Sequence, residues 1–321
     1  MKLIHEGKVK KVFQDPGSTD RVVIEFTDTV TAGDGEKKEE IEGKGELACR
    51  MTEYLLGYLE GKGIDTHFVK PLDGPQMLAR KVDIYPMEVV CRNIAAGSFC
   101  RRYGVEKGTV LEKPLVEFFV KDDNLHDPLI TPEAIISLGL VSDKNLQFMR
   151  SVTLSSNYYL VELLKQQGLT LVDFKLEFGC TEAGHIVIAD ELSGDTMRVW
   201  DEKSKSLDKD VFREDKGDLI EVYSKLVDSL LSAKPEDVSN RNEMIQVVVQ
   251  PKSGIKNPPG EVTKKALIRL GFGEAEEVRV GKIFNILLQK PVTSEILNQL
   301  SIMNIKLLSN PISEKHEVSL D

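Results

Sequence analysis

The stretch from Leu171 to Leu192 constrains the fold of this chain most, because its pattern requires two neighbouring strands. Its first arm alternates apolar and charged residues, which places three charged side chains on one face of a strand: Asp173, Lys175 and Glu177. A short turn at 180–184 leads into a second apolar arm that ends at Asp190. If the arms pair as antiparallel strands, Asp190 falls opposite the region 175–177, to within one residue of register.

The charged face of this hairpin has two interpretations. Alternating charge commonly marks a solvated strand face that carries a salt bridge. The other face is strongly apolar, however, and carboxylates converge on the charged face from both arms. Such a set also suits a site for Mg²⁺ and phosphate, in which carboxylate oxygens hold the metal and a lysine supplies a point charge.

The overall composition narrows the class of protein. A length of 321 residues allows two or three domains, and a net charge of −10 argues against a nucleic-acid-binding surface. The four cysteines form no CxxC pair, which excludes an obvious zinc module and indicates a reducing compartment. The N-terminus becomes charged too soon for a signal peptide, and no apolar run approaches membrane length. We therefore expect a cytoplasmic protein that binds neither nucleic acid nor membrane.

Basic residues near the N-terminus form a second candidate site. Lys8 and Lys10 lie two residues apart in a strand predicted over 8–13, so both face the same side. They are either an exposed pair on an edge strand or a contact for nucleotide phosphates beneath a hairpin. Further along, two glycines frame Asp34 in a loop, a pattern that tight turns commonly share.

Two further segments place polar residues at the ends of predicted strands. A strand over 87–92 ends at Arg92 and leads through small residues to Gly97 and Ser98 before a helix. This arrangement favours a phosphate nest, although a strand-to-helix corner needs small residues too. His126 and Asp127 lie in a loop after a strand, where functional residues concentrate, although such a pair commonly caps its own loop.

Domain boundaries follow from a polar segment in the last third of the chain. A helix predicted over 218–231 closes the first domain, residues 1–231, and residues 232–242 lack apolar periodicity, which indicates a linker. Residues 243–321 then predict a β-α-β-β-α-β order, with a strand or hairpin over 277–289 and a second helix over 293–303. That order suits a small α/β two-layer sandwich. Its strands would expose an edge, so we expect a homo-oligomer.

Seven motifs of the first domain occur in the order and spacing of one enzyme family. They are GKVKKVF, TAGDG, VVCRNIAAGSF, KDDNLHDPLI, LVDFKLEFG, ADEL and RVWD. Together they resemble phosphoribosylaminoimidazole-succinocarboxamide synthase, also called SAICAR synthetase, over nearly all of residues 1–231. The resemblance implies an α+β fold of two lobes with ATP in the cleft between them. It also implies an ATP- and Mg²⁺-dependent ligase that joins L-aspartate to carboxyaminoimidazole ribonucleotide in purine biosynthesis.

The same resemblance implies roles for individual residues. Lys8 and Lys10 would contact ATP phosphates, with Lys81 nearby, and Lys175 would hold phosphate. The strand that includes Glu88 and ends at Val90 would lie along the adenine, and the metal ligands would be Glu177 and Asp190. The ribonucleotide 5′-phosphate would be held by Arg92, Ser98 and Arg198. Five residues would line the substrate end: Asp34, Lys121, Asp127, Asp173 and Arg213. The catalytic residues would be Asp34, Lys121, Asp127, Asp173 and Lys175.

The last part of the chain resembles a different purine-pathway protein. MIQVVVQPKSGIKNPPGEVTKKAL, EVRVGKIFNI and KLLSNPISEKHEV are similar to the small S subunit of formylglycinamidine ribonucleotide synthase. That resemblance implies a non-catalytic assembly module over residues 243–321 that holds the large synthetase and glutaminase subunits. The whole chain thus resembles a fusion of two purine-pathway proteins.

Two other functions remain open at this point. A small-molecule kinase would share the nucleotide cleft, transfer phosphate to a hydroxyl group and need no aspartate. A non-catalytic scaffold for purine enzymes would rely on the C-terminal part, although the acids and the lysine of the central hairpin are intact.

Overall fold

The computed structural model describes residues 1–32, 37–233, 243–288 and 312–320, together with positions 293, 296, 299, 303 and 307–310. The chain divides into two compact units, Met1–Glu236 and Asp237–Asp321. Of the predicted linker, all but residues 232 and 233 lie outside the described residues. Among the residues that the structure describes, no helix is both long and apolar enough to cross a membrane.

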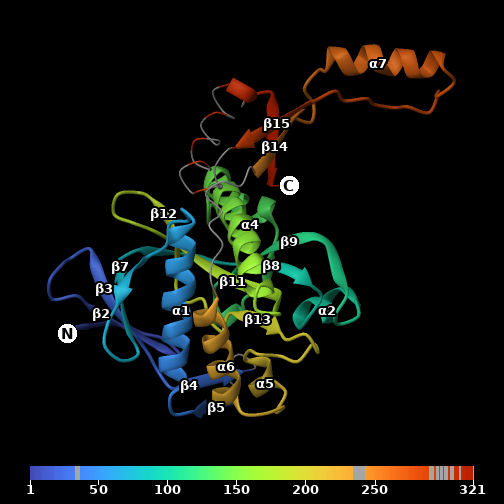
Figure 1. The fold of residues 1–321 in the computed structure, drawn as a ribbon. Helices are drawn as coiled ribbons and strands as arrows, with labels where there is room; N and C mark the ends of the chain where they lie inside the picture. Colours follow the sequence, from blue (N-terminus) through green and yellow to red (C-terminus); the bar gives the residue numbers. More distant parts are fainter. Residues whose placement is uncertain are drawn as a thin grey trace. The chain divides into compact units, whose positions relative to one another are not determined.

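The first lobe of the N-terminal unit is a five-stranded antiparallel sheet with the order β1-β2-β3-β7-β6. Its strands are β1 (Leu3–Glu6), β2 (Lys10–Gln14), β3 (Arg21–Phe26), β7 (Gln76–Arg80) and β6 (Phe68–Pro71). Helix α1 (Lys44–Gly61) packs against this sheet because its apolar residues recur at helical spacing (Figure 1). The buried core that they share contains Val22, Ile24, Phe26, Ala48, Cys49, Met77 and Ala79.

The second lobe is a six-stranded sheet with the order β10-β9-β8-β11-β12, in which β13 also pairs with β11. Its strands are β8 (Asp83–Ile94), β9 (Val110–Val120), β10 (Leu129–Ile130), β11 (Thr170–Cys180), β12 (Ile186–Ala189) and β13 (Met197–Trp200). Strands β11 and β12 form the predicted antiparallel hairpin, with Glu177 opposite Ala189. Asp190 therefore follows one residue beyond the end of β12.

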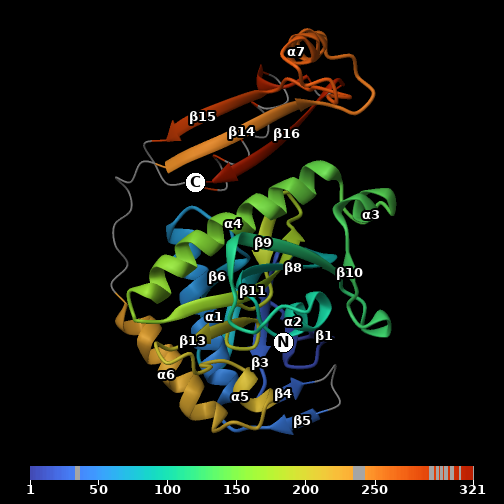
Figure 2. The same ribbon diagram turned by 90° about the vertical axis from the view of Figure 1, so that its right-hand side faces the viewer.

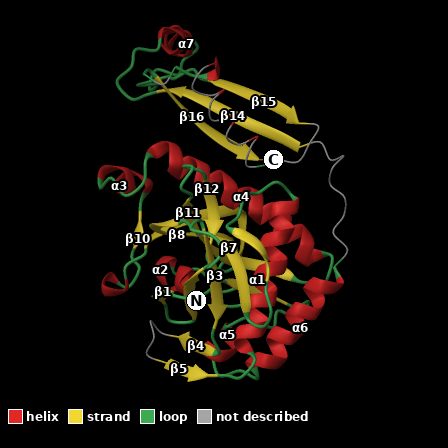
Figure 3. Ribbon diagram, turned by 90° about the vertical axis from the view of Figure 1, so that its left-hand side faces the viewer, coloured by secondary structure: helices red, strands yellow, loops and turns green. Residues whose placement is uncertain are grey.

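Helices cover the sheets on the outside of this unit (Figure 3). Helix α4 (Asp143–Lys165) lies across the second sheet (Figure 2), and the predicted cap is present because the Ser142 hydroxyl accepts from the Asn145 N–H at 3.3 Å. Helix α6 (Leu219–Ser232) packs beside α1 and begins after Asp218, whose carboxylate accepts from two backbone N–H groups. The shorter elements are β4 (Thr29–Ala32), β5 (Lys37–Glu40), α2 (Ser98–Tyr103), η1 (Asp123–Leu125), α3 (Pro132–Ser137) and α5 (Asp210–Arg213).

The C-terminal unit contains a three-stranded antiparallel sheet with the order β15-β14-β16. Its described elements are β14 (Glu243–Pro251), α7 (Pro258–Arg269), β15 (Lys282–Leu288) and β16 (Glu314–Leu320). The hairpin alternative over 277–289 is wrong: residues 277–281 form no strand, and β15 is the one described strand of this range, paired with β14. Most of the predicted helix over 293–303 lies outside the described residues.

Candidate active site

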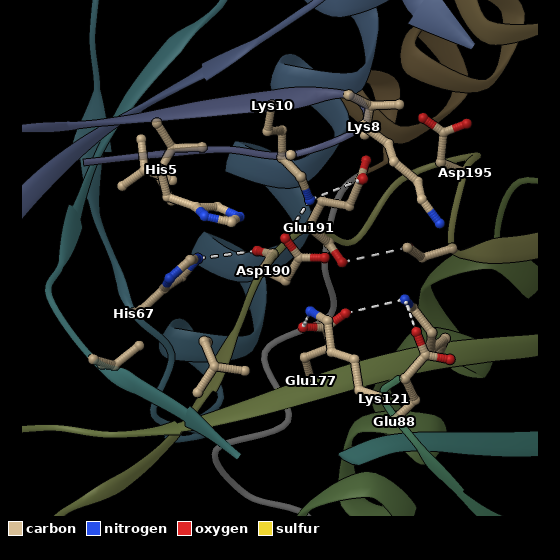
Figure 4. Close-up of a pocket in the computed structure, with 18 of the residues that line it drawn as sticks. His5, Lys8, Lys10, His67, Glu88, Lys121, Glu177, Asp190, Glu191 and Asp195 are labelled. Atoms are coloured by element: carbon tan, nitrogen blue, oxygen red, sulfur yellow. Dashed lines mark hydrogen bonds and ion pairs between the residues drawn. The ribbon is translucent and has the colours of Figure 1, made fainter. Parts of the chain in front are cut away.

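A pocket of about 1040 Å³ opens between the two sheets of the N-terminal unit (Figure 4). One side comes from the N-terminal strands and includes Lys8 and Lys10, and the other comes from β8 and β11. Nine of the predicted site residues line this pocket: Lys8, Lys10, Lys81, Glu88, Lys121, Asp127, Lys175, Glu177 and Asp190. Sequence positions from 8 to 190 thus converge on one cavity.

Lys10 is held by two carboxylates that follow β12. Its ammonium contacts the Asp190 carboxylate and lies 3.0 Å from the Glu191 carboxylate (Figure 4). Burial alone would lower the pKa of Lys10, but the two carboxylates outweigh it and raise that pKa above its usual value. Lys10 therefore stays a cation. Its side chain is 13% exposed, so it is no exposed edge lysine.

A second group of alternating charges lies on β11 and its neighbours. Lys175 Nζ donates to Glu88 at 2.6 Å and to Glu177 at 3.1 Å, and Lys121 also pairs with Glu177. The side chain of Glu177 is only 3% exposed. The interpretation of this strand face as a solvated surface is therefore wrong. Burial would lower the pKa of Lys175, and the Glu177 and Glu88 carboxylates instead raise it.

His67 and the backbone of Asp190 form a contact that sequence reasoning missed. Asp190 has a left-handed φ of 63°, which is strained for a residue with a side chain. His67 Nε2 donates to the Asp190 carbonyl oxygen at 3.0 Å, so the neutral ring carries its proton on Nε2. Burial lowers the pKa of His67 to about 4 despite the nearby Asp190 carboxylate. A histidine before an apolar strand gave no sequence signal of this contact.

The residues predicted to hold a 5′-phosphate lie in a third charged group. Asp173 accepts from Arg92 at 2.9 Å and from Arg198 at 2.8 Å, and Asp210 accepts from Arg198 Nε at 2.8 Å. Arg92 also pairs with Glu117, and its side chain is only 4% exposed. Arg213 donates to the other oxygen of Asp210 at 2.6 Å. Arg92 is thus enclosed by carboxylates, whereas the Arg198 side chain is 18% exposed.

The turn that leads into α2 is shaped by this group. Gly97 has a φ of 56°, and a Cβ there would lie 2.6 Å from Arg198 Nη2, so only glycine fits. The next residue, Ser98, accepts a hydrogen bond from Arg102 Nη1 at 3.0 Å. Small residues at this corner therefore serve the close approach of Arg198.

The remaining predicted residues are placed as follows. Asp127 Oδ1 accepts from the Asp122 N–H at 2.9 Å, so it caps its loop and lines the pocket as well. Val90 lies in the middle of the sheet, paired with β9 on one side and β11 on the other. Among the described residues, the pocket lining from β8 stops at Glu88. Asp34 lies outside the described residues.

The carboxylates of the pocket bear on metal binding. The described part of the chain contains no group of three or more His, Cys, Asp or Glu side chains arranged to hold a metal. Glu177 and Asp190 both line the pocket, each beside a lysine. Two carboxylates of this kind fit Mg²⁺, which takes one or two of them and completes its shell with water and phosphate oxygens.

The chain matches two family models in succession. Residues 3–230 match a model described as SAICAR synthetase. Residues 244–321 match a model described as phosphoribosylformylglycinamidine (FGAM) synthase.

Individual relatives cover the first of these regions. A phosphoribosylaminoimidazole-succinocarboxamide synthase of Staphylococcus saprophyticus is 46% identical over 231 residues, which cover 72% of this chain and 99% of that protein. One of Lysinibacillus sphaericus is 48% identical over 231 residues, or 71% of this chain and 97% of that protein. A solved structure of "SAICAR synthetase (Type-2) in complex with ADP" is 43% identical, with a TM-score of 0.69 over 73% of this chain and 100% of that chain.

Proposed function

Because this chain belongs to the SAICAR synthetase family, and is thus a ligase of purine biosynthesis with an added C-terminal domain, we propose the details of its reaction as follows. Residues 1–231 join L-aspartate to the carboxylate of carboxyaminoimidazole ribonucleotide with conversion of ATP to ADP and phosphate. The observation that carries this proposal is the pocket in which lysines alternate with buried carboxylates.

ATP is the proposed cofactor, and the relative solved with ADP supports it. Lys8, Lys10, Lys81 and Lys175 line the pocket and supply cations for the phosphates. The adenine would lie along residues 81–86 rather than along 87–90, because residues 81–86 line the pocket while Val90 is paired on both sides within the sheet.

Mg²⁺ is the second proposed cofactor, with Glu177 and Asp190 as its protein ligands. When bound, it would neutralise charge on the phosphates of ATP. The lysines that pair with these carboxylates would then be available to the phosphate oxygens. Bringing ATP, a carboxylate and aspartate together needs such cations, because the negative charges otherwise repel one another strongly.

The reaction runs in two steps. A carboxylate oxygen of the ribonucleotide attacks the γ-phosphorus, ADP leaves, and an acyl phosphate forms. The amine nitrogen of aspartate then attacks the acyl carbon, phosphate leaves, and the amine loses a proton to give the amide. Lys175 would hold the transferred phosphoryl group, and Lys121, Asp127 and Asp173 would line the substrate end.

The ribonucleotide phosphate is proposed to bind beside α2. Ser98 and Arg198 are the contacts that the geometry supports best, since Arg198 is partly exposed and approaches Gly97 closely. Arg92, enclosed by Glu117 and Asp173, would orient Asp173. Arg213 stays a proposed substrate contact, because its side chain is 34% exposed and turns toward Asp210.

The proposed division of the chain is a ligase domain over 1–231, a linker over 232–242 and an assembly domain over 243–321. The family match of the last part supports recruitment of the large synthetase and glutaminase subunits of FGAM synthase. Self-association into a homo-oligomer is proposed because β15 and β16 are the outer strands of the described three-stranded sheet. A cytoplasmic location is part of the same proposal.

The test is phosphate release from ATP with the ribonucleotide, with and without L-aspartate. Release that requires both substrates, with formation of the amide, supports the ligase. Release without aspartate would point to a kinase-like reaction. Absence of release from folded protein with Mg²⁺ would overturn the proposal and favour the scaffold.

A further inference from the structure

Lys209 belongs to a buried cluster at one end of the pocket that the roles above leave unused. Its ammonium lies 3.3 Å from Asp195 Oδ1, and the Lys44 ammonium contacts the other oxygen of the same carboxylate. The side chains of Lys44 and Lys209 are 1% and 10% exposed. Lys209 and Asp195 nevertheless line the pocket, and Figure 4 shows Asp195 on the side away from His67.

The position of Lys209 is fixed by the backbone and by an aromatic ring. Its N–H donates to the Gly194 carbonyl at 3.0 Å. The ring of Tyr223 packs so closely on Gly194 that a Cβ there would lie 2.6 Å from it, and the Tyr223 hydroxyl donates to Asp195 Oδ1 at 3.1 Å. A long side chain anchored in this way loses little freedom when it binds a ligand.

Two cations of the cluster share one carboxylate. Within the described part of the chain, Asp195 is the carboxylate at ion-pair distance from both Lys44 and Lys209. Burial lowers the pKa of Lys209, and the Arg213 and Lys44 cations add to the lowering, whereas the Asp195 carboxylate and, more weakly, the Glu191 carboxylate oppose it. An anion placed beside Lys209 would therefore stabilise an ammonium that is largely removed from water and shares its carboxylate with Lys44.

The location of Lys209 indicates which anion this is. The Thr196 carbonyl, one residue after Asp195, accepts from the Lys175 N–H at 2.8 Å, and Asp210, one residue after Lys209, binds Arg198. Lys209 thus lies between the group proposed for the transferred phosphoryl and the group proposed for the ribonucleotide. The attacking amine has to reach the acyl carbon at this junction.

We propose that the Lys209 ammonium binds a carboxylate of the incoming amino acid, with Asp195, Lys44 and Tyr223 holding it in place. This inference rests on the proposed ligase function. A carboxylate of the ribonucleotide is the other source of the same chemistry, and the two are distinguished by which substrate loses affinity.

The experiment compares Lys209→Met with the wild-type full chain. Loss of one charge-assisted hydrogen bond predicts a rise of roughly 10- to 100-fold in the KM for L-aspartate, with the KM values for ATP and the ribonucleotide changed by less than about 3-fold. Lys209→Arg keeps the cation and should recover part of the affinity. Lys203→Met removes an exposed lysine six positions before Lys209 and should behave as wild type.

Direct binding of L-aspartate, measured by calorimetry in the presence of ADP and the ribonucleotide, separates this inference from the proposed function. Weaker L-aspartate binding by Lys209→Met supports the inference even if turnover fails. An unchanged KM and unchanged binding in a variant that still binds ADP would overturn it. A rise confined to the KM for the ribonucleotide would also overturn it, because the carboxylate would then belong to that substrate.

Discussion

Single residues of the pocket owe their charge states to one another. Lys10 and Lys175 are partly buried ammoniums, and each keeps its proton because two carboxylates face it. Removing one charge leaves its partners buried and unpaired, which costs more than the pair itself contributes. Conservative amide substitutions therefore test function with the least change of shape.

We predict that Glu177→Gln and Asp190→Asn each lower turnover by at least about 10², a typical effect of losing one electrostatic contributor to a transition state. Steady-state rates across a Mg²⁺ titration measure it. Glu182→Gln, an exposed carboxyl in the turn between β11 and β12, is the control and should keep the wild-type rate. A wild-type rate at saturating Mg²⁺ in either pocket variant would remove that residue as a metal ligand.

Glu53 gives a prediction for the pH dependence of stability. Burial raises its pKa to about 7 from 4.5, so the folded state favours the protonated form. This contribution is fully present below pH 4.5 and is lost as the pH rises through 7. Glu53→Gln should therefore raise the free energy of unfolding at pH 8 by about 1 to 3 kcal/mol relative to wild type.

Urea denaturation at pH 5 and pH 8 measures this difference. Glu46 is exposed on the same helix, so Glu46→Gln should change the free energy of unfolding between pH 5 and pH 8 by as much as wild type does. If the free energy of unfolding of Glu53→Gln changes between pH 5 and pH 8 by as much as that of wild type, the raised pKa of Glu53 is contradicted.

The charged residues of the site were predicted from sequence more readily than their partners. Alternation placed Asp173, Lys175 and Glu177 on one strand face, because a strand has a period of two. The approach of Lys10 to Asp190, 180 positions later, depends on how two sheets meet, which no local pattern encodes. His67 and Asp195 lacked a motif-like context and were missed as site residues for the same reason.

At the scale of elements, the start of α1 lies very close to the backbone at the end of β3. A Cβ at Gly45 would lie 2.8 Å from the Phe26 carbonyl oxygen, and the Gly45 N–H donates to Asp28 Oδ1 at 2.9 Å. The first turn of α1 therefore packs against backbone atoms of Phe26 and Thr27, which cannot move aside as a flexible side chain could. Twelve positions on, a Cβ at Gly57 would meet only the Phe68 ring, at an ordinary 3.6 Å.

These two glycines make a matched pair. Gly45→Ala should lower the free energy of unfolding by about 1 to 3 kcal/mol, because the helix start must shift. Gly57→Ala should raise it by about 0.5 to 1 kcal/mol through helix propensity. Thermal and urea unfolding measure both. Stabilisation by Gly45→Ala would show that the contact with Phe26 is looser than described.

Helices with clear caps were predicted closely, and the C-terminal unit less so. Ser142 and Asp218 begin their helices as expected, because a side-chain oxygen satisfies the first free N–H groups. The run from 277 to 289 is apolar enough for a hairpin, but only its second half pairs with β14. Pairing partners, rather than strand propensity, decided this boundary.

For the whole molecule, the division into Met1–Glu236 and Asp237–Asp321 leads to a prediction about truncation. A chain that ends at Glu236 should keep kcat and KM of the ligase within about 3-fold, because every pocket-lining residue lies before that point. The full chain is the control, and circular dichroism establishes folding. Loss of activity in a folded truncation would make the C-terminal unit part of the ligase.

The pairing of lysines with carboxylates has a consequence for the order in which ligands enter the pocket. Lys10 pairs with Asp190, and Lys121 and Lys175 pair with Glu177, so each carboxylate that a metal would take already has a cation. A divalent cation that binds the carboxylates would displace the lysine ammonium groups from them. The displaced ammonium groups would then pair with the phosphates of the nucleotide. If only the metal or only the nucleotide binds, lysine–carboxylate ion pairs break and one side of each pair is left without a counter-ion. If both bind, each carboxylate pairs with the metal and each lysine with a phosphate. Nucleotide and metal should accordingly bind cooperatively, each raising the affinity of the pocket for the other.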